Sequence, residues 1–336
     1  MEIKQFSDVY GHKEIIGHLQ TAVRTGEVSH AYLFDGEGGS GKRTLAQIFA
    51  MLLLCRDKDL QALRPEPCGH CASCIKVSGG NHPDLIFVTH EKPNLISVDE
   101  IRTQVVETVP VRPYESPYKV YIIDDADKMN PQAQNALLKT LEEPPSYVVI
   151  LLLSDNRDAM LPTVLSRCVS LSLRPLSNAA VVGYLTDEFH LSTREAELIA
   201  SYAQGNIGRA KAAAMSGDFS SLLTGALRIL TTIRKMGERD AIAAIADLAK
   251  EKQSVYEYLD VFTIWYRDVL LYKATKDPGG LTFRDKIEAI AEQAKLSSYE
   301  GLQAILSAID KARIRLRANV NFETTMELLF LTMMEN

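Results

Sequence analysis

Residues 36–44 read Gly-Glu-Gly-Gly-Ser-Gly-Lys-Arg-Thr, and this stretch decides the fold. An apolar run at residues 31–34 precedes it, and a helical pattern at residues 45–52 follows it. Strand, glycine-rich loop and helix in this order are the setting of a phosphate-binding P-loop, where backbone N–H groups and a helix N-terminus surround an anion. A glycine-rich turn without a nucleotide role is the alternative. The lysine and the flanking elements favour an α/β nucleotide-binding core, with Lys42 directed at the terminal phosphates.

The loop departs from the P-loop pattern at one position. The pattern has Ser or Thr after the lysine because that hydroxyl ligates magnesium, and this chain has Arg43 there. Thr44 follows, but one residue along a helix rotates a side chain by about 100°. Its hydroxyl should therefore point away from the metal. We expect a loop built for a nucleotide that lacks one part of a hydrolytic site, and whether ATP and Mg²⁺ bind stays open.

A second apolar run, at residues 120–123, ends in two carboxylates, Asp124 and Asp125. At the end of the corresponding strand in P-loop ATPases, the first carboxylate holds magnesium. The next position commonly carries a Glu that orients the attacking water, and Asp125 is one methylene shorter. A solvated acidic turn is the alternative, and the nearby P-loop argues against it.

Four of the five cysteines lie close together in the sequence, at Cys55, Cys68, Cys71 and Cys74. Four thiolates can close a tetrahedral zinc site, and four protein ligands leave no position for water, so such a zinc is structural. Free thiols or a redox CxxC pair are the alternatives, and His70 is an alternative ligand. The predicted zinc-binding insert spans about residues 55–80.

The bulk composition indicates a soluble globular protein. The 336 residues are 46% hydrophobic and 24% charged, enough for two or three domains with sizeable cores. The net charge of −6 argues against nucleic-acid binding through overall charge. No apolar run is long enough for a membrane span, and the N-terminus has no signal-peptide core. We therefore expect a cytoplasmic location.

Strand and helix patterns alternate up to Pro175, which predicts a parallel sheet covered by helices over residues 1–175. Only helical patterns follow. They predict a small helical domain at residues 176–216 and an all-α domain at residues 217–336, with a boundary at Gly217. The last helices carry a basic set that we interpret as a solvated face: Lys311, Arg313, Arg315 and Arg317.

Further motifs are spaced along the whole chain. They are Phe6-x-Asp8-Val9-x-Gly11, His30-Ala31-Tyr32-Leu33-Phe34, Asp124-Asp125-Ala126-Asp127-Lys128-Met129, Asn135-Ala136-Leu137-Leu138-Lys139-x-Leu141-Glu142-Glu143-Pro144, Ser166-Arg167-Cys168 and Gly205-Asn206-x-Gly208-Arg209. Together with the P-loop and the four cysteines, they make the chain resemble a bacterial clamp-loader subunit of the AAA+ class. The resemblance implies an α/β P-loop (AAA+) domain with a zinc-binding insert, a small helical lid domain and an all-α C-terminal collar domain for oligomerisation.

The resemblance also implies roles for particular residues. Arg167 corresponds to the catalytic arginine finger that acts in trans, in the ATP site of a neighbouring subunit, and a planar, always-charged guanidinium suits that task. Ser154 falls at the family's first sensor position, and Arg209 matches the second sensor. The expected nucleotide-binding residues are Gly36, Gly38, Gly39, Ser40, Gly41, Lys42, Arg43, Thr44, Asp124, Asp125, Ser154 and Arg209.

Two kinds of subunit in this family match the chain: an ATP-hydrolysing gamma/tau type and a stator-like type that supplies a finger without hydrolysis. Arg43 and the single helical C-terminal domain favour the stator-like type, whose own ATPase is absent or weak. The implied partners are gamma/tau and delta subunits in a heteropentamer, the sliding clamp, and primer-template DNA through the complex. Polymerase activity would belong to the holoenzyme. The rivals are a working ATPase subunit and a zinc-dependent nucleic-acid-binding module acting alone.

Overall fold

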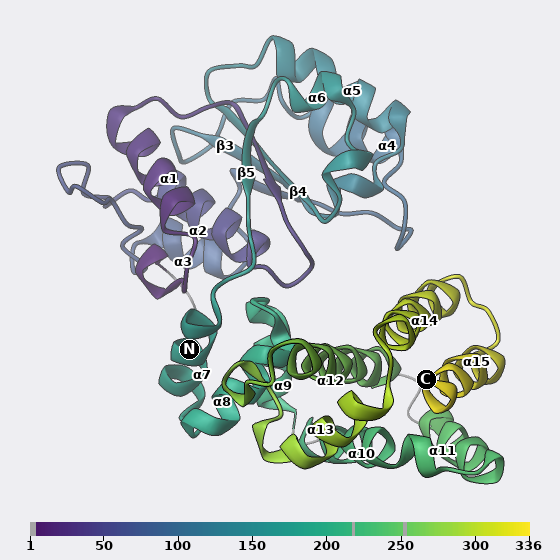
Figure 1. The fold of residues 1–336 in the computed structure, drawn as a ribbon. Coiled ribbons are helices and arrows are strands. Elements are labelled where there is room, and N and C mark those ends of the chain that lie inside the picture. Colours follow the sequence, from purple (N-terminus) through teal and green to yellow (C-terminus); the bar gives the residue numbers. More distant parts are fainter. Residues whose placement is uncertain (1–4, 217–218, 251–253) are drawn as a thin grey trace. The chain divides into compact units, whose positions relative to one another are not determined.

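The computed structural model describes residues 5–216, 219–250 and 254–336 (Figure 1). The chain forms two compact units, Met1–Tyr184 with Asn206–Arg209, and Leu185–Gly205 with Ala210–Asn336. The expected boundary at Gly217 lies outside the described residues. The division into domains 1–175, 176–216 and 217–336 stays a prediction.

The first unit is built on a five-stranded parallel sheet in the order β2-β3-β4-β1-β5. Every residue of β4 is buried, as expected for a central strand of a parallel sheet covered on both faces. The sequence-predicted α/β core is therefore confirmed. The strands are β1 Ala31–Asp35, β2 Leu85–Val88, β3 Lys119–Ile123, β4 Val148–Ser154 and β5 Val169–Ser172.

Helices cover both faces of this sheet. Successive strand residues point to opposite faces, so Tyr32 and Phe34 of β1 join one hydrophobic cluster while Ala31 and Leu33 join the other. The first cluster includes side chains of α1, α2 and α3, and the second includes side chains of α4, α5 and α6. These helices are α1 Lys13–Thr25, α2 Lys42–Leu54, α3 Ala72–Ser78, α4 Val98–Ile101, α5 Pro131–Glu142 and α6 Pro162–Leu165.

Local sequence sets the starts of α4 and α5. Ser97 and Glu100 form a capping box at α4, and Asn130 Oδ1 accepts a hydrogen bond from the Ala133 N–H at 2.8 Å at the start of α5. The apolar spacing of residues 98–109 predicts one continuous helix, and the structure corrects this prediction. After α4 the backbone widens into a π-helical segment, η2 (Arg102–Val106), which keeps the β-branched Val105 buried.

The second unit is helical throughout its regular structure. Trp265 Nε1 donates to Gln293 Oε1 at 2.8 Å, and Gln293 Nε2 donates to the Leu230 carbonyl at 2.6 Å, so this buried network joins α12, α13 and α10. The helices are α8 Thr193–Ala203, α9 Ile207–Met215, α10 Phe219–Thr232, α11 Glu238–Lys250, α12 Val255–Thr275, α13 Ile287–Leu296, α14 Tyr299–Arg317 and α15 Phe322–Glu335, while α7 Asn178–Phe189 spans both units. Among the described helices, none has the length and hydropathy needed to cross a bilayer.

One member of the predicted solvated basic face is not solvated. Arg313 forms an ion pair with Asp260 at 2.6 Å and donates to Thr263 Oγ1 at 3.2 Å, both on α12. Its side chain is only 22% exposed. The packing of α14 against α12 brings a carboxylate to this arginine, and helix periodicity alone could not reveal that partner.

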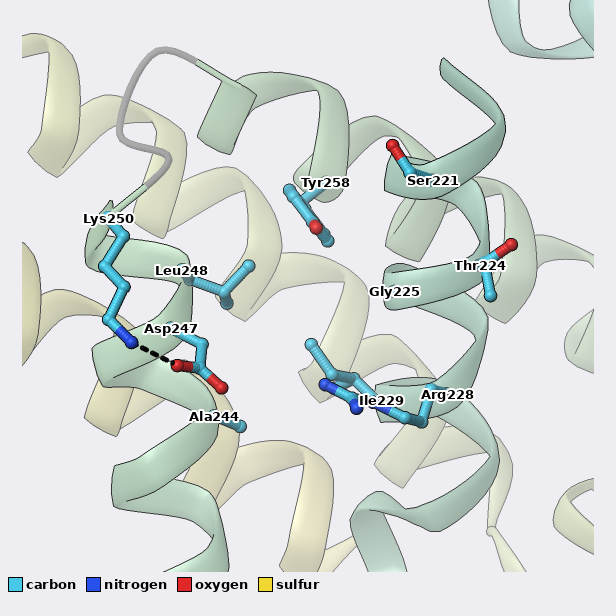
Figure 2. Close-up of a pocket in the computed structure, with 10 residues that line it drawn as sticks. All are labelled: Ser221, Thr224, Gly225, Arg228, Ile229, Ala244, Asp247, Leu248, Lys250 and Tyr258. Carbon is cyan, nitrogen blue, oxygen red and sulfur yellow. Dashed lines mark hydrogen bonds and ion pairs between the residues drawn. The ribbon is translucent and has the colours of Figure 1, made fainter. Parts of the chain in front are cut away.

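The second unit also has a pocket of about 400 Å³ between α10, α11 and the start of α12 (Figure 2). Gly225 lies where a Cβ would come within 2.8 Å of the Tyr258 hydroxyl, so a side chain here would displace that ring. Lys250 pairs at 2.8 Å with Asp247, three residues earlier on α11 (Figure 2). The ten lining residues include none of the site residues predicted from sequence.

Candidate functional site

The glycine-rich loop lies between the end of β1 and the start of α2. The Gly36 N–H donates to the Ser154 carbonyl at 3.2 Å, which ties the loop to the end of β4. Gly39 and Gly41 have φ values of 83° and 100°, a conformation that strains residues with a Cβ. The loop thus has the strand-loop-helix geometry that the sequence predicted, at the carboxyl edge of the sheet where ligands of such folds bind.

Lys42 is held by its own chain. Its Nζ donates to the carbonyls of Gly36 and Glu37 at 2.6 and 2.9 Å, and to Asp155 Oδ1 at 2.6 Å. An ammonium group has three N–H donors, so every donor is engaged, and the side chain is only 7% exposed. A carboxylate thus lies beside Lys42, in the setting where a P-loop lysine meets phosphate. Asp155 was missed by the sequence analysis, although it directly follows the predicted sensor Ser154.

Arg43 lies near the carboxylate that was expected to hold magnesium. Its Nη1 is 3.5 Å from Asp124 Oδ2, and its guanidinium carbon is 5.9 Å from the centre of the Phe87 ring. The side chain is 65% exposed, so the ion pair contributes little stability. The arrangement places a fixed positive charge next to Asp124. Thr44 follows in the first turn of α2.

The second carboxylate is also engaged. Asp125 has a left-handed backbone (φ 54°), and its Oδ2 lies 2.7 Å from Lys128 Nζ and 3.9 Å from His90 Nε2. Ser154, at the predicted first sensor, is fully buried, and its hydroxyl accepts a hydrogen bond from the Asn156 N–H at 3.2 Å. Both side chains therefore have partners within the chain.

The segment Asn206–Arg209, which belongs to the first unit, packs directly on the P-loop. Asn206 Nδ2 donates to the Gly38 carbonyl at 2.8 Å, and the Gly208 N–H donates to the Gly39 carbonyl at 2.9 Å. A Cβ on Gly208 would lie 2.8 Å from the Gly39 backbone, so only glycine fits this approach. Arg209, the predicted second sensor, directly follows this contact. Asn206 was quoted in the motif but was not expected to bind the loop.

Ser40 carries a buried hydroxyl without a partner. Its backbone carbonyl is within hydrogen-bond distance of His12 Nε2, at 3.2 Å. Its side-chain hydroxyl is buried and makes no hydrogen bond within the residues that the structure describes. A buried polar atom without a partner costs free energy, and an anion in the loop would supply one. The loop thus combines an engaged lysine with an unsatisfied hydroxyl.

The four predicted thiols do come together, and they can hold a metal ion. All four sulfurs lie within 4.8 Å of one another, with Cys55 Sγ to Cys71 Sγ at 4.0 Å and Cys68 Sγ to Cys74 Sγ at 3.9 Å. A tetrahedral zinc with bonds of about 2.3 Å separates its sulfurs by about 3.8 Å, which these distances nearly match. His70 is exposed and its Nδ1 is 2.8 Å from the Cys68 carbonyl.

The thiols differ in acidity. Burial raises the pKa of the Cys55 and Cys74 thiols. Burial also opposes ionisation of Cys71, but backbone hydrogen bonds at Cys74 and Arg56 and side-chain hydrogen bonds with Cys68 and Cys74 outweigh it and lower its pKa to about 6. Because a metal binds thiolates, an ion here would offset the cost of ionising the buried sulfurs.

A hydrogen-bond network anchors the thiol cluster to the end of α2. Cys55 is the C-cap residue of that helix. Ser73 Oγ donates to the Leu54 carbonyl at 2.7 Å, and His82 Nε2 lies 2.8 Å from the same hydroxyl. Such supporting contacts commonly orient metal ligands. The helix therefore carries the glycine-rich loop at one end and the thiol cluster at the other.

Arg167 lies just after α6. Its Nη2 is 2.8 Å from Glu142 Oε1, and its Nη1 donates to the Thr163 carbonyl at 2.8 Å and to Ser166 Oγ at 3.2 Å. The side chain is 35% exposed. The guanidinium is thus oriented by its own chain while part of it faces solvent.

Comparison with known proteins shows the family to which the chain belongs. A family model described as DNA polymerase III, delta subunit, matches residues 11–177, and one described as its C terminal part matches residues 226–334. The delta' subunit of DNA polymerase III from Bacillus subtilis is 30% identical over 322 residues, covering 94% of each chain. The delta' subunit from Pseudomonas aeruginosa is 30% identical over 314 residues, covering 90% of each chain.

The tau subunit of DNA polymerase III from Bacillus subtilis is also 30% identical, over 328 residues. That match covers 91% of this chain but only 57% of tau. The matches place the chain among DNA polymerase III subunits. Because two delta' relatives are matched over at least 90% of both chains, the chain belongs to the family of DNA polymerase III delta' subunits.

Proposed function

We propose that this chain is a stator-like clamp-loader subunit, which takes part in ATP-driven loading of the sliding clamp onto primed DNA. Family membership supports the general role. Its partners are then gamma/tau and delta subunits in a heteropentamer, with the clamp and primer-template DNA bound through the complex. Replication proteins of this kind act in the bacterial cytoplasm, and we assign the chain there.

The observation that carries the stator-like role is the pairing of Arg43 with Asp124. In a hydrolysing P-loop site, a hydroxyl and a carboxylate at these positions both serve magnesium. Here a guanidinium stands in for the hydroxyl and lies beside the carboxylate, so a cation site would contain a fixed positive charge. A nucleotide that binds this loop is therefore not hydrolysed efficiently.

The residues present suit an anion better than they suit magnesium. The α2 N-terminus, the unsatisfied Ser40 hydroxyl and the Lys42 ammonium would hold the phosphates. Lys42 must first exchange Asp155 or a loop carbonyl for a phosphate oxygen. ATP, when bound, would supply the negative charge that these groups hold, and the groups of this chain would orient its phosphates.

We propose that the metal bound by Cys55, Cys68, Cys71 and Cys74 is zinc. A tetrahedral set of four thiolates is typical of structural zinc, and sulfur separations of 3.9 and 4.0 Å support it. Because the four sulfurs fill the coordination shell, this zinc has no catalytic role.

Arg167 is the residue through which this chain acts on a neighbour's ATP. Arg167→Ala should leave the chain folded, since a partly exposed side chain seldom changes stability by more than about 0.5 kcal/mol. It should lower clamp- and DNA-stimulated ATP hydrolysis in a loader reconstituted with wild-type partners. A finger in trans is typically worth about 10³ to 10⁵ in rate, although several ATP sites in one ring dilute the observed loss.

The matched control is Arg102→Ala, which removes an exposed arginine whose carboxylate partner, Asp99, is 4.0 Å away. Steady-state hydrolysis and clamp loading are measured for both variants, after gel filtration has verified the assembled complex. Wild-type rates with Arg167→Ala would refute the finger.

The rival function is a working ATPase of the gamma/tau type, and the 30% identity to tau over 91% of this chain favours it. Turnover of ATP by the isolated chain with magnesium separates the two. A rate similar to that of an assembled loader would establish the rival, and negligible turnover would support the stator-like role.

A further inference from the structure

The segment that carries Arg167 is attached to α5 at two points. Near the start of that helix, buried Gln134 donates through Nε2 to the Ala159 carbonyl at 3.0 Å and accepts through Oε1 from the Leu161 N–H at 2.7 Å. At the last residue of α5, Glu142 Oε1 lies 2.8 Å from Arg167 Nη2. Helix α5 therefore supports both ends of the short segment around α6.

Glu142 is the charged member of the three groups that hold the guanidinium. The other two, the Thr163 carbonyl and Ser166 Oγ, both accept from Nη1 and lie within four residues of Arg167. These two contacts hold Nη1 to the local turn, but the guanidinium plane can still rotate about that nitrogen. Glu142 holds Nη2 from another element, and two separated contacts fix the plane of a guanidinium.

We propose that Glu142 is the positioning residue for Arg167, holding its guanidinium in the orientation in which it meets a neighbouring subunit's ATP. The inference rests on the proposed trans finger. It assigns to this carboxylate a role in the orientation of the finger, separate from the stability of the chain.

The exposure of the pair suits this role. Glu142 is 50% exposed and Arg167 is 35% exposed, and ion pairs in such settings contribute only about 0–1 kcal/mol. A phosphate oxygen can therefore compete for a guanidinium N–H at small cost, while the contacts at Thr163 and Ser166 persist. The place of Glu142 is itself secure, because neighbouring Leu141 is buried in the core and Pro144 ends the helix.

The test compares Glu142→Ala and Glu142→Gln with Arg167→Ala in the loader reconstituted with wild-type partners. Glu142→Ala should lower kcat for stimulated ATP hydrolysis at the site that Arg167 serves by about five- to tenfold, since misplacing a catalytic group by 1 Å costs up to about 10²-fold. The other ATP sites in the ring dilute the loss seen for the whole loader, as they do for Arg167→Ala. The KM for ATP should not change. Glu142→Gln keeps an oxygen acceptor at the same place and should retain most of the rate. Glu143→Gln is the matched control, because it alters the neighbouring carboxylate and leaves the ion pair between Glu142 and Arg167 in place.

A double variant makes the test specific. In the Arg167→Ala background, Glu142→Ala should cause no further loss, because no finger remains to be positioned. Wild-type or raised kcat in Glu142→Ala, with a clear defect in Arg167→Ala, overturns the positioning role and leaves the proposed function standing. Equal additional losses in both backgrounds also overturn it. If Arg167→Ala shows no defect, the proposed finger itself is refuted.

Discussion

The two ends of helix α2 carry two candidate sites that differ in how complete their donor sets are. At the C-terminal end, Cys55 joins three more thiols, and the four sulfurs lie within 4.8 Å of one another. At the N-terminal end the glycine loop keeps its shape, but Arg43 replaces a hydroxyl and Lys42 is engaged by Asp155. A zinc site of four thiolates needs all four ligands to hold its metal. A P-loop, by contrast, can keep its fold without a nucleotide once its lysine is paired within the chain.

Removal of one thiol tests the difference between the two ends of α2 most directly. Cys74→Ser should abolish tight metal binding and lower the free energy of unfolding by on the order of 4 kcal/mol, because loss of a metal site is among the largest single-residue effects. Metal analysis and thermal unfolding of the purified full chain measure the two effects.

Cys168→Ser is the control for that experiment, because Cys168 is not among the clustered thiols. It is a single thiol outside the cluster, so its replacement should leave the zinc content unchanged. An undiminished zinc content in folded Cys74→Ser protein would show that the cluster does not hold zinc.

A smaller effect is expected from restoring the hydroxyl at the other end of α2. Arg43→Thr should strengthen magnesium-dependent nucleotide binding by about tenfold, since it removes a positive charge beside Asp124 and returns a metal ligand. Titration of a fluorescent ATP analogue, with magnesium and with EDTA, measures this change. Thr44→Val is the control, because its hydroxyl is expected to point away from the metal. Identical metal dependence in wild type and Arg43→Thr would show that Arg43 is not at the metal position.

The smallest expected effect is the pH dependence of stability that comes from His12, which contacts the glycine loop at Ser40. Burial lowers the pKa of His12 below its ordinary value of 6.5, although its contact with the Ser40 carbonyl opposes this. The unfolded chain therefore takes up this proton first as the pH falls through about 6.5, and folded stability declines until the folded pKa is passed. Above pH 6.5 the group has no such effect.

His12→Asn should make thermal stability less sensitive to a shift from pH 7.5 to pH 5.5. Asparagine is chosen because residue 12 has a left-handed backbone, with φ 51°, which asparagine tolerates. Burial also lowers the pKa of His82, so some acid sensitivity should remain in the variant. An unchanged pH dependence would show that protonation of His12 does not contribute to the acid sensitivity of the fold.

Local sequence patterns determined much of this molecule. The apolar runs at residues 31–34 and 120–123, the alternation of strands and helices, the glycine loop and the thiol cluster were all predicted, because each depends on neighbouring residues or periodicity. The same patterns identified Arg43 as a departure. The π-helical turn at Arg102–Val106 was not predicted, since its hydrophobic spacing is indistinguishable from that of an ordinary helix over one turn.

Only the tertiary structure decided which partners these groups have. Asp155 reaches Lys42, Asn206 reaches Gly38 and Glu142 reaches Arg167, over sequence separations that no local pattern spans. The order of the parallel strands brings the first pair to one edge of the sheet, and the packing of α5 beside α6 brings the last pair together. Sequence determined which chemical groups the chain carries, while strand register and helix packing decided which of them are engaged and which face solvent, because those contacts form only when distant segments fold together.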